Sequence, residues 1–321
     1  MALGARLRAA VEVGYHSPPE LEREPWTAFW ADLEAGFAEA ETNRDVLHAF
    51  DMAVRSLGMS HLHLYAPRPA PRAAGDMAAD PPVHVRYEVR PGGSTADGAA
   101  TGGVAVLRID RFLLDETAEP IGDALRDVAE RRSAALVLDL RQCSGGDLTA
   151  MTVAAHLVAE PTPIGLFIAR PWWDGHDRVP RPGEWAGLPH VREPDLGAFF
   201  EALTGVGAAV GVVTPAEFRY DGPVYVLTSP ETASAAEPLV HLLKATGRAT
   251  VVGERTMGAM LSSDTADLGG GWTLVYPGAD YVTAEGGRLE GVGVAPDVAA
   301  PSNRALAVAL GLIEGEPSGS R

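Results

Sequence analysis

The sequence predicts an α/β fold in which a mixed β-sheet core is covered by helices, with a small helical domain before it. Two observations predict this fold. From residue 104 onward, short apolar stretches alternate with stretches of helical spacing, an alternation typical of sheets covered by helices. Residues 25–57 keep helical spacing throughout. With 321 residues, 46% of them hydrophobic, the chain is long enough to bury a sizeable core.

The N-terminal region, residues 1–66, is predicted to be the helical domain. Thr42 or Asn43 is a suitable N-cap for a second helix that runs toward Leu57, and Gly58 is a suitable stop. An aromatic and apolar stripe precedes this helix at three- and four-residue steps, which place its members on one face for core packing. The stripe comprises Trp26, Phe29, Trp30, Leu33 and Phe37.

Residues 67–103 are rich in Pro, Gly and Ala and are predicted to be a linker with one short strand at 83–89. The core follows at 104–313, and residues 314–321 form a flexible tail. Strands are predicted where apolar residues cluster, at 104–109, 134–140, 164–169, 224–227, 249–252, 272–276 and 280–283. Helices are predicted between them, at 120–131, 148–158, 233–246 and 304–312. Residues 170–220 are predicted to be an irregular insertion with a short helix at 196–203.

Composition excludes several classes of partner. The formal net charge of −17 argues against nucleic acid and anionic membrane surfaces, because both bind through clustered Lys and Arg. The single cysteine, Cys143, excludes an intramolecular disulfide, and no signal peptide is recognised at the N-terminus, so we expect a cytoplasmic protein. Among His and Cys pairs only His61 and His63 have ligand-like spacing, which a half-buried strand also gives; we therefore expect neither metal nor cofactor.

Two turns between a strand and a helix are candidates for chemistry. Gly145 and Gly146 follow a buried strand, and such a turn exposes backbone N–H groups that bind an anion or a developing oxyanion, although it also suits a plain tight turn. Ser234 follows the strand at 224–227, among small residues at the start of a helix. The residues alone leave two roles open for Ser234, a nucleophile or a helix cap.

Several ordered motifs resemble the tail-specific (C-terminal processing) serine peptidase family, in particular its branch with interphotoreceptor retinoid-binding protein and the tricorn peptidase. The motifs are LDLR at 138–141 with the following glycine pair, VYVLTSPETASAAE at 224–237, GRATVVGERT at 247–256 and EGVGVAPDV at 290–298. The resemblance covers roughly residues 104–160 and 222–312. It implies a crotonase/Clp-like core, and it implies that Ser234 is the nucleophile.

One departure from the family pattern concerns the general base. Ala259 stands where tail-specific peptidases have a catalytic lysine, and an alanine side chain accepts no proton. The tricorn-like branch implies another base, His61, with Ser60 and Glu290 orienting it. Imidazole suits this role because its ordinary pKa lies near 6.5. The resemblance also implies an oxyanion hole made by the N–H groups of Gly145 or Gly146 and of Ala235.

The sequence therefore predicts a serine hydrolase that forms an acyl-enzyme on Ser234, with a peptide or small acyl-type substrate. An amide or an ester bond would use the same residues, and so would an acyl-transfer or cyclising enzyme of a biosynthetic pathway. A non-catalytic protein that binds a retinoid-like or fatty-acid-like ligand is the alternative from a different class. The peptide-binding PDZ domain of processing peptidases is expected to be absent, since only a short, loop-like stretch is available near 67–103.

Some neighbouring residues receive weaker assignments. His63 lies one strand period from His61 and is expected to line the site. The tryptophans of the predicted insertion, Trp172, Trp173 and Trp185, form either a substrate wall or ordinary core. Glu237 is predicted to be a structural acid of the first helical turn. Asp139 and Arg141 are predicted to fix the glycine turn by pairing.

Overall fold

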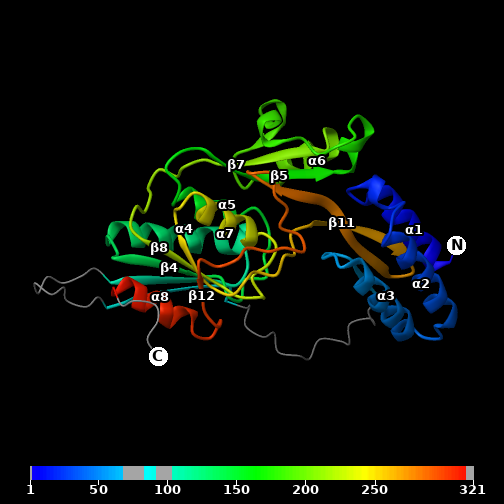
Figure 1. Ribbon diagram of the computed structural model, residues 1–321, viewed down its shortest axis with the longest axis horizontal. Coiled ribbons are helices and arrows are strands. Elements are labelled where there is room, and N and C mark those ends of the chain that lie inside the picture. The colour runs from blue at the N-terminus through cyan, green and yellow to red at the C-terminus, as the bar shows by residue number, and fades with distance from the viewer. Residues whose placement is uncertain (1, 68–82, 92–102, 316–321) are drawn as a thin grey trace, which may run out of the picture.

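The computed structural model describes residues 2–67, 83–91 and 103–315, which form two sheets with helices packed against them (Figure 1). The first sheet has the order β12-β9-β8-β4-β3-β2, in which only β2 is antiparallel to its neighbour. Its strands are β12 (Val298–Ala299), β9 (Thr250–Gly253), β8 (Val224–Thr228), β4 (Ala135–Asp139), β3 (Val104–Ile109) and β2 (Val85–Arg90).

Helices cover both faces of this sheet because the strands are apolar on both sides. Leu136 and Leu138 of β4 belong to the large core cluster, while Val137 between them belongs to the cluster of the opposite face. The large cluster contains residues of α4 (Leu114–Glu130), α5 (Ala150–Ala155) and α7 (Ala236–Ala245), and the opposite cluster those of α8 (Ala305–Ile313).

The second sheet has the order β1-β11-β5-β7-β6, and β10 also pairs with β11. Its strands are β1 (His63–Tyr65), β11 (Trp272–Thr283), β5 (Thr162–Ala169), β7 (Ala208–Val213), β6 (His190–Val191) and β10 (Ser262–Gly269). The 12-residue β11 pairs with β1 along its first half and with β5 along its second half. It thereby joins the N-terminal part of the molecule to the core.

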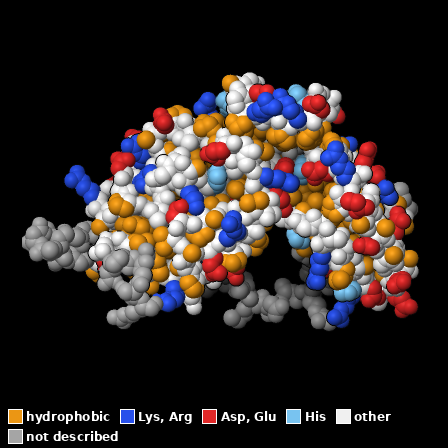
Figure 2. Space-filling model, viewed as in Figure 1, with side chains coloured by type: hydrophobic (Ala, Val, Ile, Leu, Met, Phe, Trp, Pro, Cys, Tyr) orange, Lys and Arg blue, Asp and Glu red, His pale blue; other side chains and the backbone are white. Residues whose placement is uncertain are grey.

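Three N-terminal helices pack on the β1, β10 and β11 end of this sheet: α1 (Leu3–Gly14), α2 (Trp26–Glu39) and α3 (Asn43–Leu57). As predicted, Thr42 caps α3, in a capping box with Asp45, and Gly58 ends it in the left-handed conformation. Four members of the predicted stripe are buried, and Phe37 packs against the same cluster. Figure 2 shows a notch between these helices and the core.

The α/β fold with a mixed-sheet core is confirmed, and several details differ from the prediction. The helix expected to begin at Pro120 begins at Leu114 and contains this proline. Strands predicted at 272–276 and 280–283 are one strand, β11, despite Pro277. Pro277 lies between the residues of β11 that pair with β1, up to Val275, and those that pair with β5, from Ala279. Its partner on β10 is Ser263, next to a register shift in that pairing.

The stretch 170–220 contains the expected helix, α6 (Leu196–Gly205), but also β6 and the fully buried β7. Small residues such as Ala208, Ala209 and Gly211 hid this strand, because they carry little strand preference of their own. The sequence also gave no warning of α1 or β10. Most of the predicted linker (68–82 and 92–102) and the end of the predicted tail (316–321) lie outside the described residues. The expected absence of a PDZ domain concerns this linker, so most of the relevant residues lie outside the described part as well.

None of the helices in the described part of the chain is long and apolar enough to cross a membrane.

Candidate active site

Ser234 lies in the turn between β8 and α7, with a backbone φ of +53°. A left-handed backbone costs free energy at a residue other than glycine, so the surrounding structure must hold it. Its N–H donates to the carbonyl of Ala259 at 3.0 Å and lies 3.1 Å from Oε2 of Glu237. The side chain of Ser234 is half-buried and lines a cavity. The turn therefore presents this hydroxyl at a fixed position beside an open space.

Glu237 is fully buried and holds the segment that lies against Ser234. Its carboxylate accepts hydrogen bonds from Thr256 Oγ1 at 2.6 Å, from the N–H of Gly258 at 2.7 Å and from the N–H of Ala259 at 2.8 Å. Burial raises the pKa of Glu237, and these hydrogen bonds oppose the rise. A structural acid was predicted here, and its contacts link the nucleophile turn to the loop after β9.

The glycine turn lies directly against Ser234. Gly145 and Gly146 have φ of +92° and +140°, and a Cβ at Gly145 would stand 2.4 Å from the Cβ of Ser234. Only glycine permits so close an approach. Within the described residues, the N–H groups of Gly146 and Ala235 have no hydrogen-bond acceptor, and both residues line the cavity with Ser234. They are therefore available to hold a negatively charged oxygen, whereas Gly145 itself is buried behind the serine.

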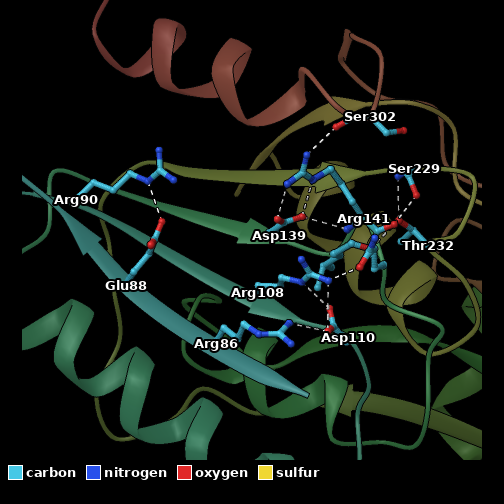
Figure 3. A network of polar contacts seen from close by, with 12 residues as sticks. Arg86, Glu88, Arg90, Arg108, Asp110, Asp139, Arg141, Ser229, Thr232 and Ser302 are labelled. Carbon is cyan, nitrogen blue, oxygen red and sulfur yellow. Dashed lines mark hydrogen bonds and ion pairs between the residues drawn. The ribbon is translucent and has the colours of Figure 1, made fainter. Parts of the chain in front are cut away.

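Hydrogen bonds tie the glycine turn to the nucleophile loop (Figure 3). Ser229 Oγ donates to the carbonyl of Arg141, and Thr232 Oγ1 donates to that of Leu140 at 2.8 Å. Asp139 pairs with the guanidinium of Arg141 at 2.7 Å, and Arg141 also donates to the carbonyl of Ser302 at 2.7 Å. The two turns are thus one cross-linked unit at the carboxyl ends of β4 and β8.

His61 lies in the turn between α3 and β1, also with a left-handed φ, +60°. Its Nδ1 is 2.6 Å from Ser60 Oγ, which donates to Glu290 Oε2 at 2.9 Å. The backbone N–H groups of Ser60 and Met260 also donate to this carboxylate, at 2.7 and 2.6 Å. The structure therefore brings Ser60, His61 and Glu290 together although 230 positions separate the first from the last.

This chain of hydrogen bonds selects one tautomer of His61. A hydroxyl has one proton, and Ser60 gives it to the carboxylate of Glu290. Ser60 Oγ is then an acceptor toward His61, so Nδ1 carries the ring proton and Nε2 keeps its lone pair. Burial lowers the pKa of His61, while the charge of Glu290 raises it and that of His63 lowers it. Burial is the largest of these effects, so the pKa of His61 lies below its ordinary value and the neutral ring is favoured.

No lysine supports the alternative base of tail-specific peptidases. Ala259 is buried, and its backbone rather than its side chain contacts the nucleophile turn. Lys244 is the only lysine in the sequence. Its Nζ lies 2.6 Å from the carbonyl of Ala295 and 3.0 Å from Asp297, near the C-terminal end of α7. Ser234 thus has no lysine partner, and among the described residues His61 is the only histidine that lines its cavity.

The cavity has a volume of about 270 Å³, and both His61 and Ser234 line it. No hydrogen bond joins these two side chains among the described residues. Apolar residues from β5, from α6 and from the segment just before β10 form most of its wall, for example Phe167, Phe199 and Met260. Sequence reasoning missed this wall, because its members are far apart along the chain.

The residues predicted at lower weight to bind substrate do not line this cavity. His63 is exposed on β1. Trp172 and Trp185 are 6% and 5% exposed, and with Trp173 they pack against β5 and β7. The indole N–H groups of Trp172 and Trp185 donate to the carbonyls of Arg178 and Pro180, respectively. In the structure these tryptophans therefore belong to the core, which was the other role considered for them.

Among the described residues, no group of three or more His, Cys, Asp or Glu side chains is arranged to hold a metal ion.

Comparisons with known proteins concern the family and the fold of this chain. A family model described as peptidase family S41 matches residues 103–300. The carboxyl-terminal-processing protease of Picosynechococcus sp. is 28% identical over 62% of this chain and 39% of its own length. The chloroplastic C-terminal processing peptidase of Tetradesmus obliquus is 28% identical over 63% of this chain and 36% of its own length. The chain thus spans less than half the length of these curated relatives.

Solved structures share the fold over nearly the whole chain. The photosystem II D1 C-terminal processing protease matches with a TM-score of 0.56 and 16% identity, over 94% of each chain. A putative peptidase from Parabacteroides merdae matches with a TM-score of 0.61 and 14% identity, over 98% of this chain and 97% of that one. The tricorn protease matches with a TM-score of 0.53 and 11% identity, over 98% of this chain and 35% of that one. At such identities the likeness shows the fold.

Proposed function

Since this chain belongs to peptidase family S41, as its motifs predicted, we propose that Ser234 is the nucleophile of a serine peptidase and His61 its general base. The observation that carries the proposal is the hydrogen-bond chain from Glu290 through Ser60 to His61. It leaves the lone pair of Nε2 free, on a ring that shares a cavity with Ser234. We also propose that the substrate is a peptide, as expected for a member of this peptidase family.

The reaction follows from these groups. Ser234 Oγ attacks the carbonyl carbon of the substrate while its proton passes to Nε2 of His61. The N–H groups of Gly146 and Ala235 hold the carbonyl oxygen, which becomes negatively charged. Gly145 packs against Ser234. The imidazolium then gives its proton to the leaving amine, and an acyl-enzyme remains on Ser234. Water attacks this ester with His61 as base again, and the proton returns to Oγ when the acid leaves.

Ser60 and Glu290 act through His61 rather than on the substrate. The carboxylate stabilises the imidazolium formed during attack, and Ser60 transmits this effect and fixes the ring. A buried acid satisfied by two backbone N–H groups, from Ser60 and Met260, is a firm anchor for such a relay.

A fluorophosphonate probe tests the proposal, because it reacts with an activated serine whatever the natural substrate. We expect intact-mass labelling at one site in the parent protein and none in Ser234→Ala. Ser263→Ala is the matched control, since this exposed hydroxyl lines the same cavity. Labelling that persists in Ser234→Ala, or a parent that stays unlabelled, would refute Ser234 as an activated nucleophile.

The apolar wall of the cavity supports one second candidate, a non-catalytic protein that binds an apolar ligand. A fatty-acid-like dye distinguishes the two. Tight dye uptake by a protein that the probe leaves unlabelled supports the binder, and labelling that the dye merely slows supports the peptidase.

A further inference from the structure

The cavity beside Ser234 is apolar on almost every side. Its wall includes side chains from α5, β5, β6, α6 and the segment before β10, among them Met151, Ile164, Phe167, Val191, Phe199 and Met260. Its volume of about 270 Å³ is close to the lower end of the range for ligand pockets, and it exceeds what a small side chain fills. A large apolar group therefore matches both the size and the chemistry of the space.

Few of the groups that line this cavity can carry a charge. Among the described residues no lysine or arginine lines it, and the titratable lining residues are His61 and Asp147. Asp147 already accepts hydrogen bonds from the N–H groups of Leu114 and Thr149, at 2.8 Å each, and from the hydroxyl of Thr149. A carboxylate placed here would lose its water without gaining a cationic partner, which is costly, and the acceptor sites of Asp147 are largely used by these hydrogen bonds.

The position of the wall indicates which part of the substrate enters. The wall continues directly from the two segments that offer free N–H groups: from Gly146 into α5 at Met151, and from Ala235 into α7 at Pro238. These N–H groups face the carbonyl oxygen, so a group beside them belongs to the acyl part. The leaving amine lies on the side of His61, which must protonate it.

We propose, on the basis of the function proposed above, that this cavity binds a large apolar side chain of the residue whose carbonyl Ser234 attacks. The preferred substrates are then peptides with an aromatic or long aliphatic residue at that position. Phe199 of α6, which is 5% exposed, forms part of the wall of the cavity. Phe200, which is 51% exposed, lies at its mouth. The exposed ring marks where the chain of the substrate leaves the cavity.

A series of N-acylated aminoalkyl diphenylphosphonates tests the proposal, since each carries one amino-acid side chain beside a phosphorus atom that Ser234 attacks with loss of phenoxide. We expect the Phe and Leu analogues to modify Ser234 at least about 10-fold faster than the Ala analogue, as apolar pockets discriminate by about 10- to 200-fold per missing group. The Lys and Glu analogues should react more slowly than Ala. Equal rates across the series, or a charged analogue that reacts fastest, would overturn the proposal.

Two pairs of variants tie the preference to this wall. Phe199→Ala should reduce the Phe-to-Ala rate ratio at least about fivefold, whereas Leu203→Ala, buried on the same helix outside the cavity, should keep it. Phe200→Asp should raise the rate of the Lys analogue relative to Phe, and Val206→Asp, exposed at the end of α6, should not. Because Phe200 is half exposed, this second variant is informative even if Phe199→Ala fails to fold.

The generic fluorophosphonate separates the two levels of failure. A protein that it does not label at Ser234 refutes the proposed function, and the substrate preference with it. A protein that it labels, but that treats all phosphonates alike, refutes only the preference for a large apolar side chain.

Discussion

The proposed nucleophile, Ser234, and its proposed base, His61, are held in different ways. Ser234 belongs to the parallel-sheet core, where Glu237, the loop after β9 and the glycine turn surround it with buried hydrogen bonds. His61 follows α3 and precedes β1, a strand of three residues. Its hydrogen-bonded link to the core runs through Ser60 to one carboxylate, that of Glu290.

The two residues nevertheless share one backbone device, a left-handed conformation, with φ of +53° at Ser234 and +60° at His61. At Ser234 the core enforces it through contacts within one cross-linked unit. At His61 the enforcement depends on how the N-terminal helices pack on β1, β10 and β11. The proposed nucleophile thus belongs to the core, whereas the proposed base belongs to the neighbouring layer of N-terminal helices and β1. Damage to the two sides should therefore have different consequences.

The largest effect should come from removing the base. His61→Ala should slow modification of Ser234 by about 10³- to 10⁴-fold, equivalent to about 4–5.5 kcal/mol, because the other titratable group among the described lining residues, Asp147, already accepts hydrogen bonds from Leu114 and Thr149. Stopped-flow labelling with the fluorophosphonate measures this rate. His63→Ala, an exposed histidine on β1, should stay within about twofold of the parent. A His61→Ala variant that keeps a tenth of the parent rate would show that another group acts as the base.

The largest effect on stability should come from the nucleophile side. Glu237→Ala removes the acceptor of Thr256 Oγ1 and of the N–H groups of Gly258 and Ala259, all in a buried site. Leaving such groups unpaired should lower the free energy of unfolding by about 3–5 kcal/mol in urea titrations. Glu231→Ala, exposed in the same loop, should leave it unchanged. If Glu237→Ala were as stable as His61→Ala, the claimed contrast between the two sides would be wrong.

The same contrast decided what the sequence could predict. The core strands around Ser234 are recognised in the sequence by their apolar stretches. The turn that holds Ser234 is also recognisable, because Ser234 and Glu237 lie within one short segment. The base side has no local signal. Ser60 and His61 were assigned only through a resemblance, and their contact with Glu290 joins residues 230 positions apart.

The apolar wall could not be predicted for a related reason. Its residues come from elements whose meeting depends on β5, β7 and β11 lying side by side. The polar β10 and the small-residue β7 lack the periodicity by which strands are recognised. The tryptophans of the 170–220 stretch allowed both interpretations, a substrate wall and ordinary core, because an aromatic side chain suits a core and a binding site equally well.

The relay should give an intermediate effect. Ser60→Ala and Glu290→Gln should each slow labelling of Ser234 by about 100-fold, less than loss of the base itself, because an unoriented imidazole still accepts a proton. Residues that act as one unit are not additive, so the double variant should be no slower than the slower single variant by more than about threefold. A double variant whose loss equals the product of the single losses would show that Ser60 and Glu290 act separately.

The smallest and most specific effect concerns pH. Protonated His61 cannot accept the proton of Ser234, so the labelling rate should rise with pH and level off above the pKa of this ring. Since burial lowers that pKa, the midpoint should lie below 6.5. The neighbours shift it in opposite directions: Glu290→Gln should move the midpoint lower, because it removes a charge that favours the imidazolium, and His63→Ala should move it higher, because it removes one that opposes it. A common direction for both variants would mean that the titrating group is not His61, and the base side of the comparison would have to be sought elsewhere in the cavity.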